Sequence, residues 1–155
     1  MKRGLILAVI QVVLVLTVTA QFLYDRATLP RVWTRSVPLD PYMPIRGRYV
    51  SLRLKVEAQC SSQFSPVPGW ALSIENGQLT ARRTEKGRHH VWAFQGDCVL
   101  GEAVPFFIPP QIPDPSRREP GEELWVEVSV PKNGPPRPIQ LAVKKDGKLQ
   151  PLNIR

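Results

Sequence analysis

The residue types that could perform chemistry are few in this 155-residue chain, and their spacing does not favour it. His89 and His90 are adjacent, and neighbours on a strand point to opposite faces, so they chelate a metal poorly and a structural role suits them better. The sequence has no glycine-rich phosphate loop and no Gly-x-Ser-x-Gly elbow, and its carboxylates lie mostly among turn residues. We therefore expect no catalytic residue, no metal, no cofactor and no enzymatic activity.

The two cysteines of the chain, Cys60 and Cys98, are more informative as partners of each other. If the domain is exported to an oxidising compartment, an even pair favours a disulfide bond between the ends of two strands. Closing this loop of 39 residues would stabilise the domain by about 3–4 kcal/mol in the chain-entropy model. The alternative is two buried thiols that act as small apolar residues, which a cytosolic location would favour.

A basic head and one long apolar segment open the sequence. Lys2 and Arg3 precede an uncharged run of 19 residues, Leu5 to Leu23. As a helix this run would be about 28 Å long, close to the roughly 30 Å hydrocarbon core of a bilayer. A cleaved signal peptide is the alternative, with residues 4–17 as its core and residues 18–20 as its cleavage site. In both cases the basic head favours export of the remaining chain.

One face of the apolar segment could pack against a partner helix. Gly4, Ala8 and Gln11 fall at positions i, i+4 and i+7, so two small residues and an amide share one side. Small residues let helix backbones approach, and an amide in lipid gains about 0.5–2 kcal/mol from a hydrogen bond to a second helix. The alternative is that Gln11 merely tolerates the membrane near its cytoplasmic side.

The rest of the chain alternates apolar and polar residues with the period of β-strands. In residues 50–58 every even position is apolar and every odd one polar, and residues 123–130 repeat the pattern. The proline-flanked residues 104–110 suit an edge strand or a covering segment. Three further pairs of short strands bracket turn sequences, which are Asn76-Gly77, Gly96-Asp97 and Asp146-Gly147.

These strands predict a mainly β fold, an antiparallel sandwich or small barrel preceded by a single N-terminal transmembrane helix. We assign residues 1–24 to the membrane segment, 25–38 to an extended linker and 39–155 to one β-rich domain. The net charge is +8, with the charged residues dispersed along the chain. A basic surface suits a domain close to anionic lipids. Because no recognition-helix, zinc or RNA-binding signature accompanies it, we expect no nucleic acid partner.

The residues from Pro38 to Leu54 carry the most distinctive motif. The positions concerned are Asp40, Pro41, Gly47, Arg48, Tyr49, Leu52 and Leu54. Through them the chain resembles the GDYXXLXY-motif family, bacterial proteins with one N-terminal hydrophobic helix and a β-rich extracytoplasmic domain. Arg48 replaces the Asp of the motif and Leu54 its final Tyr. A catalytic or metal-binding role of that Asp would therefore be lost here.

A structural role explains the same segment. Asp40-Pro41 would start a turn, Gly47 would permit a tight bend, and Tyr49 would begin a strand. The segment is also distantly similar to membrane-anchored signal peptidases. However, Tyr42 stands where these enzymes have their catalytic Ser, and no segment resembles their lysine box.

The family resemblance implies a location and an association more than an activity. It implies a single-pass protein of the bacterial inner membrane with its C-terminal domain in the periplasm, and members of the family often accompany polytopic membrane proteins. We therefore expect a non-catalytic accessory or interaction module of a larger membrane protein. The alternative is an exported envelope domain, secreted or periplasmic after signal cleavage, that binds a ligand or polymer. An unrecognised hydrolase is a third hypothesis, although no small-molecule substrate is indicated.

Overall fold

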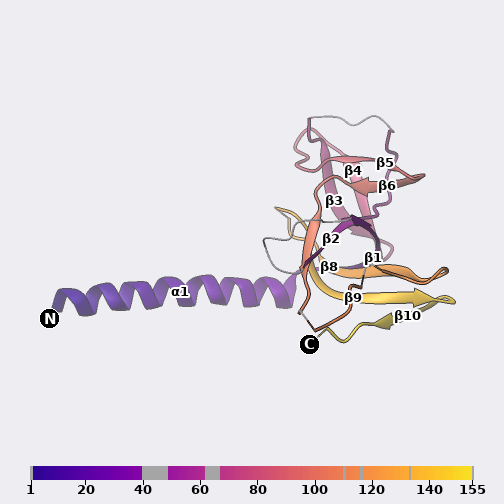
Figure 1. Ribbon diagram of the computed structural model, residues 1–155. Helices are drawn as coiled ribbons and strands as arrows, with labels where there is room; N and C mark the ends of the chain where they lie inside the picture. Colours follow the sequence, from indigo (N-terminus) through magenta and orange to yellow (C-terminus); the bar gives the residue numbers. More distant parts are fainter. Residues whose placement is uncertain are drawn as a thin grey trace.

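The computed structural model describes residues 2–39, 49–61, 67–109, 111–115, 117–132 and 134–154. Within these ranges the chain forms one long helix, α1 (Lys2–Thr28), followed by ten strands (Figure 1). The strands are β1 (Arg31–Leu39), β2 (Tyr49–Leu54), β3 (Trp70–Glu75), β4 (Gln78–Arg83), β5 (Val91–Phe94), β6 (Asp97–Leu100), β7 (Val104–Phe107), β8 (Glu123–Ser129), β9 (Arg137–Lys145) and β10 (Lys148–Pro151). The predicted fold class, antiparallel β-structure behind one N-terminal apolar helix, is confirmed.

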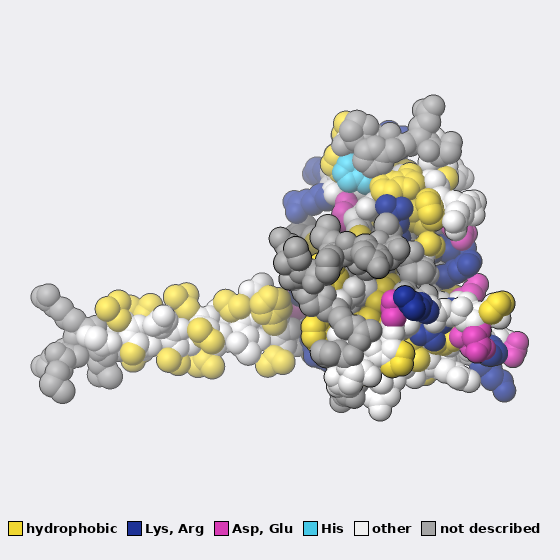
Figure 2. Space-filling view, in the orientation of Figure 1, with side chains coloured by type: hydrophobic (Ala, Val, Ile, Leu, Met, Phe, Trp, Pro, Cys, Tyr) yellow, Lys and Arg dark blue, Asp and Glu magenta, His cyan; other side chains and the backbone are white. Residues whose placement is uncertain are grey.

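Helix α1 projects from the β-domain, and its side chains from Ile6 to Leu23 are exposed (Figure 2). Its segment Ile6–Thr28 has 23 residues and a mean hydropathy of 2.4, so it is long and apolar enough to span a membrane. The hydroxyl groups of Thr17 and Thr19 donate to the carbonyl oxygens four residues earlier, each at 2.8 Å. These polar groups are therefore satisfied within the helix and do not need water.

Six strands form the main antiparallel sheet, in the order β10-β9-β8-β1-β2-β7. β1 connects its two halves. Arg31–Arg35 pairs with β8, and Ser36–Leu39 pairs with β2. β7 lies at one end of the sheet, as expected for an edge strand with a proline in it. β1 therefore holds the sheet together.

The position of β1 corrects the linker predicted over residues 25–38. Helix α1 ends at Thr28, and residues 31–38 belong to β1. The inner face of β1 is formed by Val32, Thr34 and Ser36, which are 4, 6 and 4 % exposed. Thr34 donates to the carbonyl oxygen of Lys55 at 2.6 Å, and Ser36 donates to that of Leu124 at 3.1 Å. Strands are predicted from the alternation of apolar and polar residues. β1 lacks this alternation because two of its three buried side chains are polar, so the sequence indicates a linker there instead.

The hydrophobic core lies on the inner face of this sheet. The even positions of residues 50–56 and 124–130 are buried, which confirms the two alternating patterns. Two smaller hairpins, β3–β4 and β5–β6, add further core residues, among them Leu79 and Leu100. The core is therefore closed by hairpins that are separate from the main sheet.

The hairpin turns follow the predicted turn sequences closely. Asn76 and Asp146 have φ of 51°, and each is followed by a glycine that also has positive φ. In the middle hairpin the turn is formed by Gln95 and Gly96, with φ of 52° and 88°, one residue earlier than expected. Asp97 consequently begins β6, where its side chain takes part in the charged cluster described below.

Candidate functional site

The predicted motif residues divide into two groups. Asp40, Pro41, Gly47 and Arg48 lie outside the described residues. Tyr49 begins β2 opposite Phe107, while Leu52 and Leu54 are completely buried in the core. The described part of the motif therefore starts a strand and fills the core, and it contributes no exposed reactive group.

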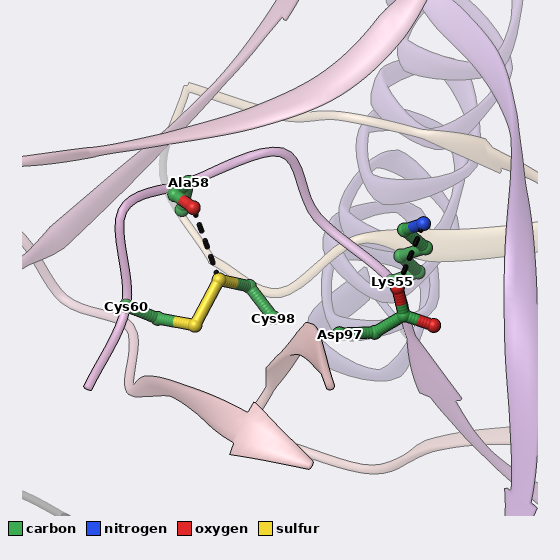
Figure 3. The surroundings of a disulfide bond; sticks show 5 residues. All are labelled: Lys55, Ala58, Cys60, Asp97 and Cys98. Atoms are coloured by element: carbon green, nitrogen blue, oxygen red, sulfur yellow. Dashed lines mark hydrogen bonds and ion pairs between the residues drawn. A yellow bond between two sulfur atoms is a disulfide. The ribbon is translucent and has the colours of Figure 1, made fainter. Parts of the chain in front are cut away.

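Cys60 and Cys98 form a disulfide bond, as predicted (Figure 3). The bond joins the segment that follows β2 to strand β6. The backbone nitrogen of Val56 also donates to the carbonyl oxygen of Cys98, at 2.9 Å. Sγ of Cys98 lies 3.0 Å from the carbonyl oxygen of Ala58, which is a close contact because a disulfide sulfur carries no proton to donate. The disulfide thus fixes the β5–β6 hairpin to the end of β2.

Beside the disulfide lies a charged cluster of Arg35, Lys55, Asp97 and Glu123. Nζ of Lys55 is 2.8 Å from a carboxylate oxygen of Asp97 (Figure 3). The guanidinium of Arg35 lies 3.6 Å from Asp97 and 3.5 Å from Glu123. All four side chains are partly exposed, so each ion pair contributes only about 0–1 kcal/mol to stability. The cluster therefore adds little to the stability of the domain, but it places four charged side chains at the surface.

The charged cluster borders a cleft of about 200 Å³. Its lining includes Trp33, Trp125 and Glu57 together with three members of the cluster. The indole nitrogen of Trp125 donates to Glu123 at 3.0 Å, and Nζ of Lys144 lies 4.5 Å from the centroid of the same ring system. Aromatic faces among fixed charges can bind sugars or charged polymers. The sequence interpretation missed this cleft because it placed Trp33 in a linker.

The last turn of α1 is fixed directly to the β-domain, and only two residues separate α1 from β1. Nη1 of Arg137 lies 3.2 Å from Oδ2 of Asp25, and its guanidinium lies 5.5 Å from the centroid of the Phe22 ring. The backbone nitrogen of Val130 donates to the carbonyl oxygen of Pro30 at 3.0 Å. These contacts hold the helix and the domain in a defined arrangement.

His89 pairs with Glu102, while the backbone nitrogen of His90 donates to the same carboxylate. Nδ1 of His89 lies 3.4 Å from Oε2 of Glu102, and the nitrogen of His90 lies 3.3 Å from Oε1. Burial alone would raise the pKa of Glu102, but the hydrogen bonds and the charge of His89 outweigh it and lower that pKa. No group of three or more potential metal ligands occurs within the described part of the chain.

The predicted packing face of α1 is exposed in the monomer. Ala8 and Gln11 are exposed, and apart from the adjoining residues of the helix itself nothing described lies within 4 Å of a Cβ built on Gly4. A partner helix could therefore approach this face without displacing any part of the described chain. That such a helix binds here stays a prediction.

Comparisons of the chain with protein-family models, with curated proteins and with solved structures found no match. The resemblance to the GDYXXLXY-motif family therefore stays a prediction from the residues that carry it.

Proposed function

We propose that this chain is a single-pass protein of the bacterial inner membrane whose periplasmic β-domain is a non-catalytic accessory module of a larger membrane protein. The observation that carries the proposal is the short, fixed junction between α1 and the β-domain. Two connecting residues and the Arg137–Asp25 ion pair leave little freedom for the domain to move away from the helix end. A domain held this way would stay at one height and orientation beside a membrane partner.

Two further features support the proposed topology. Lys2 and Arg3 favour a cytoplasmic N-terminus for α1. The Cys60–Cys98 disulfide fits a compartment in which thiols are oxidised, such as the periplasm. Both features favour a β-domain outside the cytoplasm.

The exposed face of α1 supports the proposed association. Gly4, Ala8 and Gln11 would let a second helix approach closely and would offer it one amide for hydrogen bonding. Apolar helix surfaces gain little from association in lipid, so small and polar residues decide where helices pack. We propose that the larger membrane protein supplies the helix that covers this face.

Co-purification in mild detergent tests the accessory role. The unaltered protein should retain a membrane protein partner, and the variant Ala8→Ile with Gln11→Leu should lose most of it, because a bulky side chain separates the helices and the amide is removed. Ile6→Leu with Val13→Leu, on the opposite side of α1, is the matched control and should retain the partner. Recovery of the same partner with both variants would exclude this face. Absence of any partner from the unaltered protein would contradict the accessory role.

The cleft beside the charged cluster favours a second candidate function, the binding of an envelope polymer. Trp33 and Trp125 could stack on sugar rings, while Arg35 and Glu57 could bind their polar groups. A soluble oligosaccharide of N-acetylglucosamine should then change the tryptophan fluorescence of the full chain. Trp33→Ala should abolish the change, and Trp92→Ala should not, since Trp92 does not line this cleft. An unchanged spectrum with the unaltered protein would reject binding of this sugar.

A further inference from the structure

We propose that the β-domain binds one anionic phospholipid, phosphatidylglycerol in its simplest form, in a groove at the end of α1. The inference rests on the proposed membrane-spanning role of α1. The groove has a volume of about 630 Å³. It lies between the last turn of α1, strands β7 and β9 and the C-terminal residues, which come close to the helix end (Figure 1).

The charge of the groove is suited to a phosphate group. Arg26, in the last turn of α1, and Arg31, at the start of β1, both line it and are exposed. Neither guanidinium forms an ion pair within the described part of the chain. Among the described residues of the lining Glu127 is the single carboxylate, and the two arginines outweigh its charge. Guanidinium groups bind phosphate oxygens in bidentate fashion, which suits a phosphodiester.

The polar lining is suited to the headgroup beyond the phosphate. Gln140 and Asn153 supply side-chain amides, and Glu127 supplies a carboxylate. These groups can exchange hydrogen bonds with the two hydroxyl groups of a glycerol headgroup. Phe106 and Leu152, both half-buried, add apolar surface beside them. The groove therefore offers partners for both parts of a phosphatidylglycerol headgroup.

A second, more apolar hollow gives the acyl chains a path toward the membrane. It has a volume of about 330 Å³ and shares Arg26 and Ile139 with the groove. Phe22, Leu23 and Leu29 of the helix end contribute to its lining. A lipid with its phosphate on Arg26 could thus place its glycerol ester region in this hollow and its chains along the exposed apolar side of α1.

The position of the groove along the helix selects a membrane lipid over free phosphate. The apolar segment Ile6–Thr28 is about 35 Å long at 1.5 Å per residue, slightly more than the roughly 30 Å of a hydrocarbon core. Arg26, near the end of that segment, would therefore lie at the depth of the headgroups. Arginines near an anionic membrane surface each strengthen binding by about fivefold.

Native mass spectrometry of the full-length chain in mild detergent tests the proposal. The lipid-free protein is mixed with phosphatidylglycerol, phosphatidylethanolamine or phosphatidylcholine, and the bound lipid is counted. We expect one phosphatidylglycerol to bind more tightly than either of the zwitterionic lipids. Arg26→Gln with Arg31→Gln should weaken this binding by ~10-fold or more, because the charge-assisted hydrogen bonds of both guanidinium groups to the phosphate are lost. Inorganic phosphate at matched concentration should not displace the lipid.

The matched control removes two positive charges far from the groove. Lys145→Gln with Lys148→Gln lies at the β9–β10 turn, at the end of the domain opposite the helix (Figure 1), and should bind as the unaltered protein does. Equal binding of the three lipids, displacement by phosphate, or unchanged binding to the double arginine variant would overturn the proposal. Thermal unfolding of each variant verifies that it is folded. No partner protein is present in this experiment. A failure to bind phosphatidylglycerol would therefore overturn the lipid site without bearing on the accessory role, which co-purification tests.

Discussion

The six-stranded sheet and the two hairpins are held in the fold by different means. In the sheet, neighbouring strands are joined by antiparallel ladders, and Leu52, Val126 and Leu141 are completely buried. The β3–β4 and β5–β6 hairpins form two-stranded sheets of their own, and they are linked to the end of β2 and the residues after it by backbone hydrogen bonds, isolated bridges and the Cys60–Cys98 disulfide. Both parts contribute buried apolar residues, but the sheet is held by ladders between all its strands, whereas the hairpins are joined to it by a short segment and one covalent bond.

This difference has a consequence for function. The sheet contains the junction to α1, so the orientation at the membrane would be defined by the six-stranded part of the domain. The hairpins lie at the other side of residues 55–60, beside the charged cluster and its tryptophan-lined cleft. Local opening is easiest where few ladders and buried contacts hold a segment. We expect the hairpins to open before the sheet does.

The largest effect should come from the core of the sheet. Leu52→Ala removes a completely buried side chain from β2 and should lower the free energy of unfolding by about 2–5 kcal/mol. Leu149→Ala in β10, where the leucine is 36 % exposed, is the matched control and should cost less than about 1 kcal/mol. Urea denaturation of the full chain in detergent measures both. Similar losses in the two variants would contradict the role given to burial in the sheet.

The disulfide should have the next largest effect, concentrated in the hairpins. Cys60→Ala with Cys98→Ala should lower the free energy of unfolding by up to about 4 kcal/mol in the chain-entropy model. Amide hydrogen exchange should become faster in β5 and β6 and change little in β8 and β9. Equally faster hydrogen exchange in all four strands would show that the disulfide does not act mainly on the hairpins.

The pH dependence of the hairpin region should reflect Glu102. Its pKa is lowered in the folded state, so its contribution to stability is present above the ordinary value of 4.5 and is lost as the pH falls through the folded-state pKa. Glu102→Gln should cost about 1 kcal/mol at neutral pH, as for a partly exposed hydrogen-bonded pair, and should cost less in acid. Glu85→Gln, at an exposed position, is the control. An equal cost at about pH 7 and about pH 3 would exclude this linkage.

The smallest effect on stability should come from the junction ion pair. Asp25→Asn weakens a partly exposed pair with Arg137 and should change the free energy of unfolding by less than about 1 kcal/mol. Glu75→Gln, which weakens the surface pair with Arg82, is a matched control of similar size. A loss above about 2 kcal/mol for Asp25→Asn alone would mean that the junction contributes to the core of the fold.

The sequence predicted the elements whose signals are local. Residues 50–56 and 124–130 alternate along their own length, and Asn76-Gly77 and Asp146-Gly147 specify their own turns. The disulfide followed from cysteine count and an exported location. Each of these predictions needed only neighbouring residues or simple counting.

The elements that depend on distant partners could not be predicted from the sequence. β1 has a polar inner face because Thr34 and Ser36 bond to backbone groups far along the chain, so no apolar period marks it. The Arg35–Asp97 pair joins residues from strands that become neighbours only after folding. His89 and Glu102 likewise give no local signal of their pairing. The charged cluster and the lipid groove could therefore be recognised only in three dimensions.

The proposed role requires that α1 stays attached to the β-domain, and the mature N-terminus shows whether it does. Membranes from producing cells are washed with alkaline carbonate, and the mass of the retained protein is measured intact. We expect a chain that is retained in the membrane and still contains the apolar segment Ile6–Thr28. A soluble chain that begins at Gln21, after cleavage behind Ala20, would contradict it.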